Sequence, residues 1–79
     1  MEFFENDLKI ALIVTLFRHK DLKIEVYSSL KGPYVNIHYK KQIITYSFPD
    51  IVRASSFANF LISSYLVDED FIEIFLNDL

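Results

Sequence analysis

The chain has 79 residues, which fits one domain, and we expect residues 1–79 to form a single α+β unit. It contains no cysteine, which excludes disulfide bonds and thiolate metal sites. Hydrophobic residues make up 52% of the chain, and so small a domain has little interior in which to bury them. The composition therefore predicts either that some large apolar side chains stay exposed on the monomer or that its single core is unusually dense.

The net charge of −3 is concentrated in the C-terminal part of the chain. Residues 1–20 are balanced, residues 21–48 carry two acids and four bases, and residues 49–79 carry six acids and one base. An acidic surface repels polyanions, so this charge disfavours nucleic acid and anionic lipid as partners of the C-terminal region and favours a basic one.

The first predicted element is a helix over about residues 2–19. Phe3, Ile10, Val14 and Phe17 follow one another at helical spacing. Acids stand near its start and bases near its end, which complements a helix dipole. Its apolar residues occupy most of the helix circumference, more than one sheet face can cover. The β-branched run 13–15 leaves a strand as the alternative.

Three runs of alternating polarity follow, at about residues 22–27, 34–39 and 42–48, and they predict antiparallel strands. Gly32-Pro33 and Lys40-Lys41 stand between the runs and predict turns. The side chains expected to face the core are Leu22, Ile24, Val26, Val35, Ile37, Tyr39, Ile44, Tyr46 and Phe48.

Ser47, Pro49 and Asp50 form a helix-start pattern, and the helix should extend to about residue 65. Asp68 is expected to cap a last helix, with Phe71 and Phe75 on its apolar face. The predicted fold is therefore α+β, a three-stranded antiparallel meander packed on helices in the order α-β-β-β-α-α.

The sequence lacks the motifs that mark common catalytic, cofactor and metal sites. Phosphate loops, dinucleotide fingerprints and nucleophile elbows need glycine, and Gly32 is the only one. His19 and His38 lack the spacing of metal ligands. The acids Asp68, Glu69 and Asp70 fit a capped helix start better than a cation site. We therefore predict a protein that is not an enzyme and binds neither a metal nor a cofactor.

The apolar run of residues 8–17 is too short to span a bilayer, and acids rather than bases precede it. This pattern predicts a cytoplasmic protein with no membrane partner.

A weak nucleic-acid surface is one alternative function. Tyrosines and bases on the outward side of the predicted strands combine stacking with positive charge; these residues are Lys23, Tyr27, Tyr34, His38, Lys40 and Lys41. The order helix, three strands, helix and the Gly32-Pro33 turn resemble a double-stranded-RNA-binding domain. That family carries a lysine cluster at the start of its second helix, whereas residues 49–54 here hold one acid and one base. The sequence therefore disfavours nucleic acid as a partner.

The element order, the small size and the acidic end of the chain resemble small phage-encoded inhibitors of CRISPR nucleases. The segments that carry the resemblance are residues 68–71 and 77–79, although this chain is less acidic and more apolar than those proteins. The resemblance implies an acidic regulator or inhibitor that acts on a partner protein.

The leading hypothesis is a small non-enzymatic module that binds another protein. Its expected contacts are apolar residues of the first element and acids of the last helix: Phe3, Phe4, Ile13, Leu16, Glu69, Asp70 and Glu73. A homo-oligomer with the apolar first element at the subunit interface is the second hypothesis.

Overall fold

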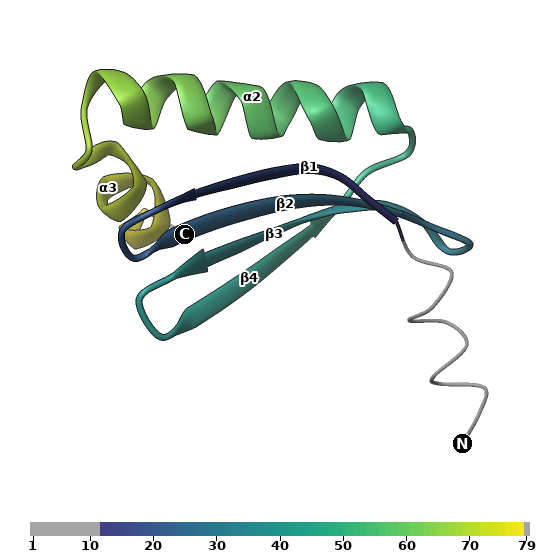
Figure 1. Cartoon of the computed structure of the whole chain (residues 1–79), viewed down its shortest axis with the longest axis horizontal. Helices are drawn as coiled ribbons and strands as arrows, with labels where there is room; N and C mark the ends of the chain where they lie inside the picture. Colours follow the sequence, from purple (N-terminus) through teal and green to yellow (C-terminus); the bar gives the residue numbers. More distant parts are fainter. Residues whose placement is uncertain (1–11, 79) are drawn as a thin grey trace.

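The computed structural model describes residues 12–78, in which a four-stranded sheet precedes two helices (Figure 1). The elements, in chain order, are β1 (Leu12–His19), β2 (Leu22–Ser29), β3 (Gly32–Tyr39), β4 (Gln42–Ser47), α2 (Ile51–Val67) and α3 (Phe71–Asn77). The α+β class is confirmed. The predicted order α-β-β-β-α-α is wrong, because the described chain runs β-β-β-β-α-α.

The error lies in the first element. The segment Leu12–His19 is an edge strand and not a helix, and it pairs antiparallel with β2. Residues 2–11 of the predicted helix lie outside the described residues. Both faces of β1 carry apolar side chains, so its sequence does not alternate and mimics helical spacing. The β-branched run Ile13-Val14-Thr15 favours a strand. With four strands before the first described helix, the order shared with double-stranded-RNA-binding domains is lost.

Each strand joins the next by a two-residue turn, which gives a simple meander in the order β1-β2-β3-β4. The Lys40-Lys41 turn is confirmed, and Lys40 adopts a positive φ of 56°. The turn expected at Gly32-Pro33 lies two residues earlier, and both residues belong to β3. Gly32 has φ 110°, a conformation that other residues rarely adopt.

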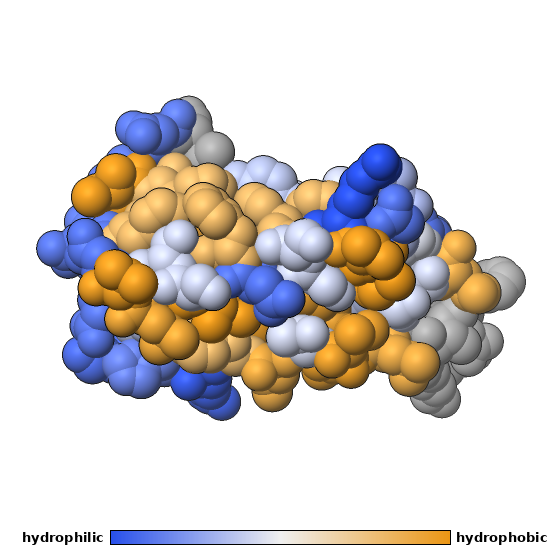
Figure 2. Space-filling model, turned by 90° about the horizontal axis from the view of Figure 1, so that it is seen from above, coloured by the Kyte–Doolittle hydropathy of each residue, from blue (hydrophilic) through white to orange (hydrophobic). Residues whose placement is uncertain are grey.

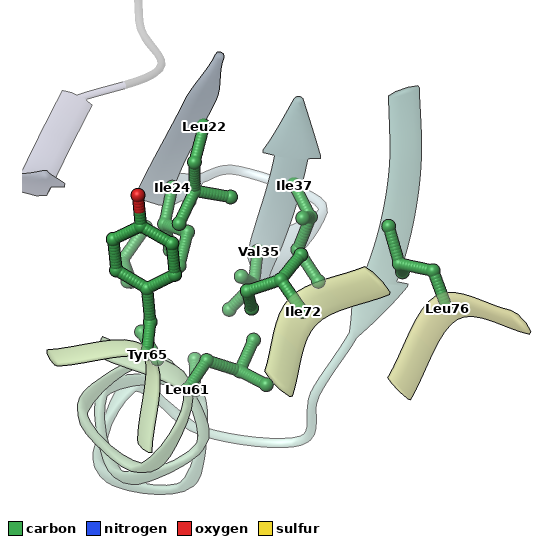
Figure 3. Packing of buried hydrophobic residues seen from close by; sticks show 11 residues of the cluster. Leu22, Ile24, Val35, Ile37, Leu61, Tyr65, Ile72 and Leu76 are labelled. Carbon is green, nitrogen blue, oxygen red and sulfur yellow. The ribbon is translucent and has the colours of Figure 1, made fainter. Parts of the chain in front are cut away.

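The two helices cover one face of the sheet, and the core lies between them and the strands (Figures 1 and 3). Leu22, Ile24 and Ile37 of the sheet are almost fully buried, as are Leu61 of α2 and Ile72 of α3. All nine side chains predicted to face inward lie in this core or pack against it. One core thus holds sheet and helices together.

The loop from the sheet to α2 ends in a helix cap. Asp50 is the N-cap of α2, and its side chain accepts a hydrogen bond of 2.8 Å from the backbone N–H of Arg53. Asp68 was expected to cap α3. Instead it is the C-cap of α2, and its carboxylate accepts from the backbone N–H of Asp70 at 3.0 Å, so α3 starts only at Phe71. Neither described helix is long and apolar enough to cross a membrane.

Candidate binding surfaces

Strand β1 is the most exposed apolar element of the sheet. Its side chains Leu12, Ile13, Val14 and Leu16 are each at least half exposed, and we call these four residues the β1 surface. Among the residues that the structure describes, β1 is a sheet edge, with β2 on one side only. Alternate residues of an edge strand direct their backbone N–H and C=O groups away from the sheet. The β1 surface therefore offers apolar side chains and free backbone groups together.

The helix layer explains why β1 is left uncovered. α2 packs mainly on the two central strands, β2 and β3. It reaches β1 through Tyr65, whose ring lies edge-on to Phe17 and whose hydroxyl is 2.8 Å from Nδ1 of His19. Phe17 is consequently only half buried, and six of the other seven residues of β1 are exposed.

The other sheet edge, β4, is better protected against pairing. It has six residues where β1 has eight, it follows Lys40-Lys41, and Pro49 stands two residues after its end. Lysine and proline beside an edge strand are common devices against edge-to-edge association. Ile43 is the exposed large apolar side chain of β4, at 65%.

Exposed apolar residues also occur on the outer side of the helices, but they are interrupted. Phe60 of α2 packs edge-on against Phe71 of α3, and Val67 is exposed at the end of α2. Seen from the helix side, Figure 2 shows hydrophobic residues interspersed with polar ones and not a uniform apolar face. The helix layer is therefore a weaker docking surface than β1.

The acids expected to bind a partner lie around α3, and two of them already have cationic neighbours. Glu69 forms an ion pair of 3.0 Å with Lys20, and Glu73 lies 3.9 Å from Lys40. The hydrogen bond and the charge of Glu69 raise the pKa of the Lys20 ammonium. These pairs connect α3 to the strand turns, which reduces the negative charge available to a partner. Asp70 is exposed and is the N-cap residue of α3.

The face of the sheet opposite the helices, here called the outer face, carries a polar cluster centred on Glu25. This carboxylate is only 6% exposed and lies 2.8 Å from Nε2 of His38. It also accepts a hydrogen bond of 3.0 Å from the hydroxyl of Tyr27, and Nζ of Lys23 is 3.8 Å away. Burial and the hydrogen bond to Glu25 raise the pKa of the Tyr27 phenol. A buried carboxylate thus organises the centre of this face.

The structure brings together four of the six residues predicted for nucleic-acid binding. Lys23, Tyr27, Tyr34 and His38 share the outer face, and the two tyrosine rings stack with centroids 5.0 Å apart. Lys40 and Lys41 lie apart from them, in the β3–β4 turn. The sequence did not single out Glu25. The hairpin register that places Lys23 opposite His38 also places this acid between that pair and Tyr27. Its negative charge opposes phosphate binding at this face.

The described part of the chain holds no group of three or more His, Asp or Glu side chains that could bind a metal ion. Of the predicted protein contacts, Ile13 and Leu16 lie on the β1 surface, whereas Phe3 and Phe4 lie outside the described residues. Comparison with models of known protein families, with curated proteins and with solved structures finds no match to this chain.

Proposed function

We propose that this chain is a small non-enzymatic module that binds a polypeptide through the β1 surface. The observation that carries the proposal is an edge strand with four large apolar side chains, Leu12, Ile13, Val14 and Leu16, each half or more exposed. Strand addition to such an edge is a common mode of peptide recognition: backbone hydrogen bonds supply affinity, and alternate side chains supply selectivity.

Apolar burial alone would not give strong binding at the β1 surface. Burying the exposed half of four such side chains contributes roughly 3–6 kcal/mol, because full burial is worth about 1.5–3 kcal/mol each. Association costs at least about 4 kcal/mol in lost translational and rotational freedom. The hydrophobic gain is therefore largely offset, and backbone pairing along β1 has to supply the remainder.

A photo-reactive amino acid in place of Leu16 tests the proposal in cells of the native host. Irradiation should give a covalent adduct of one defined mass. The matched control carries the same group in place of Ser56, an exposed residue of α2. Equal adducts at both positions, or none at Leu16, would contradict binding at β1.

We further propose that the chain regulates or inhibits a basic partner. The acidic residues beside α3 would form a second contact with that partner. Asp70 and the partly paired Glu69 and Glu73 supply its charge. The triple substitution of these acids by glutamine should weaken partner binding and reduce its dependence on salt. Unchanged affinity at low salt would remove this contact from the proposal.

The stacked Tyr27–Tyr34 pair favours a second candidate function, the binding of single-stranded nucleic acid on the outer face. Lys23 supplies the positive charge of that face, but it and His38 both lie beside Glu25. A labelled single-stranded RNA titrated at low salt tests this candidate by fluorescence anisotropy. Lys23→Ala should lower the affinity, and absence of binding by the wild-type protein at low salt ends it.

A further inference from the structure

We propose that α3 undocks from the core and docks again while the sheet and α2 stay folded, and that Lys20 and Lys40 of the strand turns bias it toward the docked state. Undocking would uncover the part of the core that α3 covers. This conformational device is separate from the β1 surface and does not depend on what binds there.

The sequence of α3 gives it little stability of its own. The helix has seven residues, and isolated helices of this length are unstable in water. Within the described chain, the side chain of its N-cap residue Asp70 makes no capping hydrogen bond. The C-cap residue Asp78 places an acid at the negative end of the helix dipole, which is unfavourable. The helix therefore depends on its tertiary contacts.

Those contacts are few. Ile72 is fully buried and Leu76 is 9% exposed, and both point into the core (Figure 3), whereas Phe71 and Phe75 are only partly buried. A hollow of about 460 Å³ lies between α3 and the β3–β4 turn, and a second of about 400 Å³ lies between Phe71 and the end of α2. Atoms beside a hollow lack packing partners on that side. Segments with few buried apolar contacts open at a lower free energy than the whole fold.

The connection between the helices allows α3 to move without unwinding α2. The backbone N–H of Asp68 donates to the C=O of Ser64 at 3.0 Å, so α2 is complete before the connection begins. Residues 66–70 are all exposed. A change of backbone conformation in this segment therefore disturbs no buried side chain.

Two lysines connect α3 to the turns at its end of the sheet (Figure 1). Nζ of Lys20 lies 3.0 Å from Glu69, and Nζ of Lys40 lies 3.9 Å from Glu73, whose carboxylate also accepts a hydrogen bond of 3.4 Å from the Tyr39 hydroxyl. Both ion pairs are more than half exposed, so each is weak and screened by salt. They should shift the docking equilibrium by a small and measurable factor.

Amide hydrogen exchange of the full chain, followed by NMR, tests the proposal. The backbone N–H of Ile74, which donates to the C=O of Asp70 at 3.1 Å, reports on α3, and that of Leu61 reports on α2. The protection factor of Ile74 should be at least about tenfold lower than that of Leu61. Lys20→Gln should lower the protection of Ile74 a further two- to fivefold, roughly the worth of an exposed ion pair, and leave Leu61 unchanged. Raising the salt to about 1 M should act on the wild-type protein in the same direction and act less on the variant.

The matched control is Lys31→Gln, which removes an exposed lysine from the β2–β3 turn at the opposite end of the sheet. It should leave both protection factors unchanged. Equal protection of Ile74 and Leu61 in the wild-type protein would overturn the proposal, because α3 would then open only when the whole chain unfolds. Equal effects of Lys20→Gln and Lys31→Gln on Ile74, or equal losses at Ile74 and Leu61 in Lys20→Gln, would overturn the role of the turn lysine.

Discussion

At the scale of single residues, Glu25 is an acidic side chain that is buried on the face of the sheet away from the helices. His38 and Tyr27 hold it at 2.8 and 3.0 Å. A carboxylate removed from water is tolerated only where hydrogen bonds and opposite charges replace its hydration. The outer face therefore depends on a polar network, whereas the opposite face depends on apolar packing.

We expect Glu25→Ala to lower the free energy of unfolding by about 2 kcal/mol, because the substitution leaves partly buried donors without their acceptor. Urea unfolding followed by circular dichroism measures the change. Thr45→Ala serves as control, since it removes an exposed hydrogen bond of 2.6 Å to Asn36 on the same face; it should cost less than about 0.5 kcal/mol. Equal losses of unfolding free energy in both variants would show that the Glu25 network stabilises the fold no more than an exposed hydrogen bond does.

Two tyrosines, Tyr65 and Tyr27, make the free energy of unfolding depend on pH. Burial raises the pKa of the Tyr65 phenol above its ordinary value of 10.0, and the pKa of Tyr27 is raised as well. A pKa that is higher in the folded state means that this state binds the proton more tightly. The stabilisation is complete below pH 10 and is lost as the pH rises through the raised values.

We therefore expect the free energy of unfolding to fall as the pH rises above 10, and Tyr65→Phe to make this fall less steep. Urea unfolding at a series of alkaline pH values measures the slope. Lys20, whose pKa is also raised, contributes with the same sign and remains in the variant. The control Thr45→Ala removes no titratable group and should retain the wild-type slope. Identical slopes for the two variants would contradict a role for Tyr65.

At the scale of elements, the hairpin turns carry backbone strain. Lys40 has φ 56°, in the left-handed region where a side chain other than glycine or asparagine is disfavoured. Lys40→Gly should raise the free energy of unfolding by about 1 kcal/mol, since the strain relieved exceeds the weak contact with Glu73 that is lost. Thermal unfolding compares it with Lys41→Gly, which relieves no positive φ and should not stabilise. A destabilised Lys40→Gly protein would refute the strain argument.

The elements also show what the sequence could and could not predict. Alternation predicted the central strands because one of their faces is buried and the other is polar, as in Leu22, Ile24 and Val26. The spacing of β1 predicts a helix because this edge strand, on which α2 does not mainly pack, carries apolar residues on both faces. Glu25 was missed for a related reason, since sequence alternation places a side chain on a face but does not show how far its neighbours cover it.

At the scale of the whole molecule, the described chain has one core and leaves large apolar side chains outside it. Val52, Leu66 and Val67 of α2 are each more than 60% exposed, as are Leu12 and Ile43 of the edge strands. The expectation from composition, that so small a domain exposes part of its apolar content, agrees with this surface. Isolated exposed residues are ordinary, so the contiguous set on β1 is the informative one.

A single core also makes the stability of the whole molecule sensitive to one cavity. Leu61→Ala should cost about 3 kcal/mol, because its side chain is fully buried between α2 and the sheet (Figure 3). A chain of this length has only about 4–12 kcal/mol in total, so the variant should unfold at a much lower urea concentration. Val67→Ala, in the same helix but 89% exposed, should shift the midpoint little. Comparable shifts for the two variants would mean that the helix layer is not anchored through Leu61.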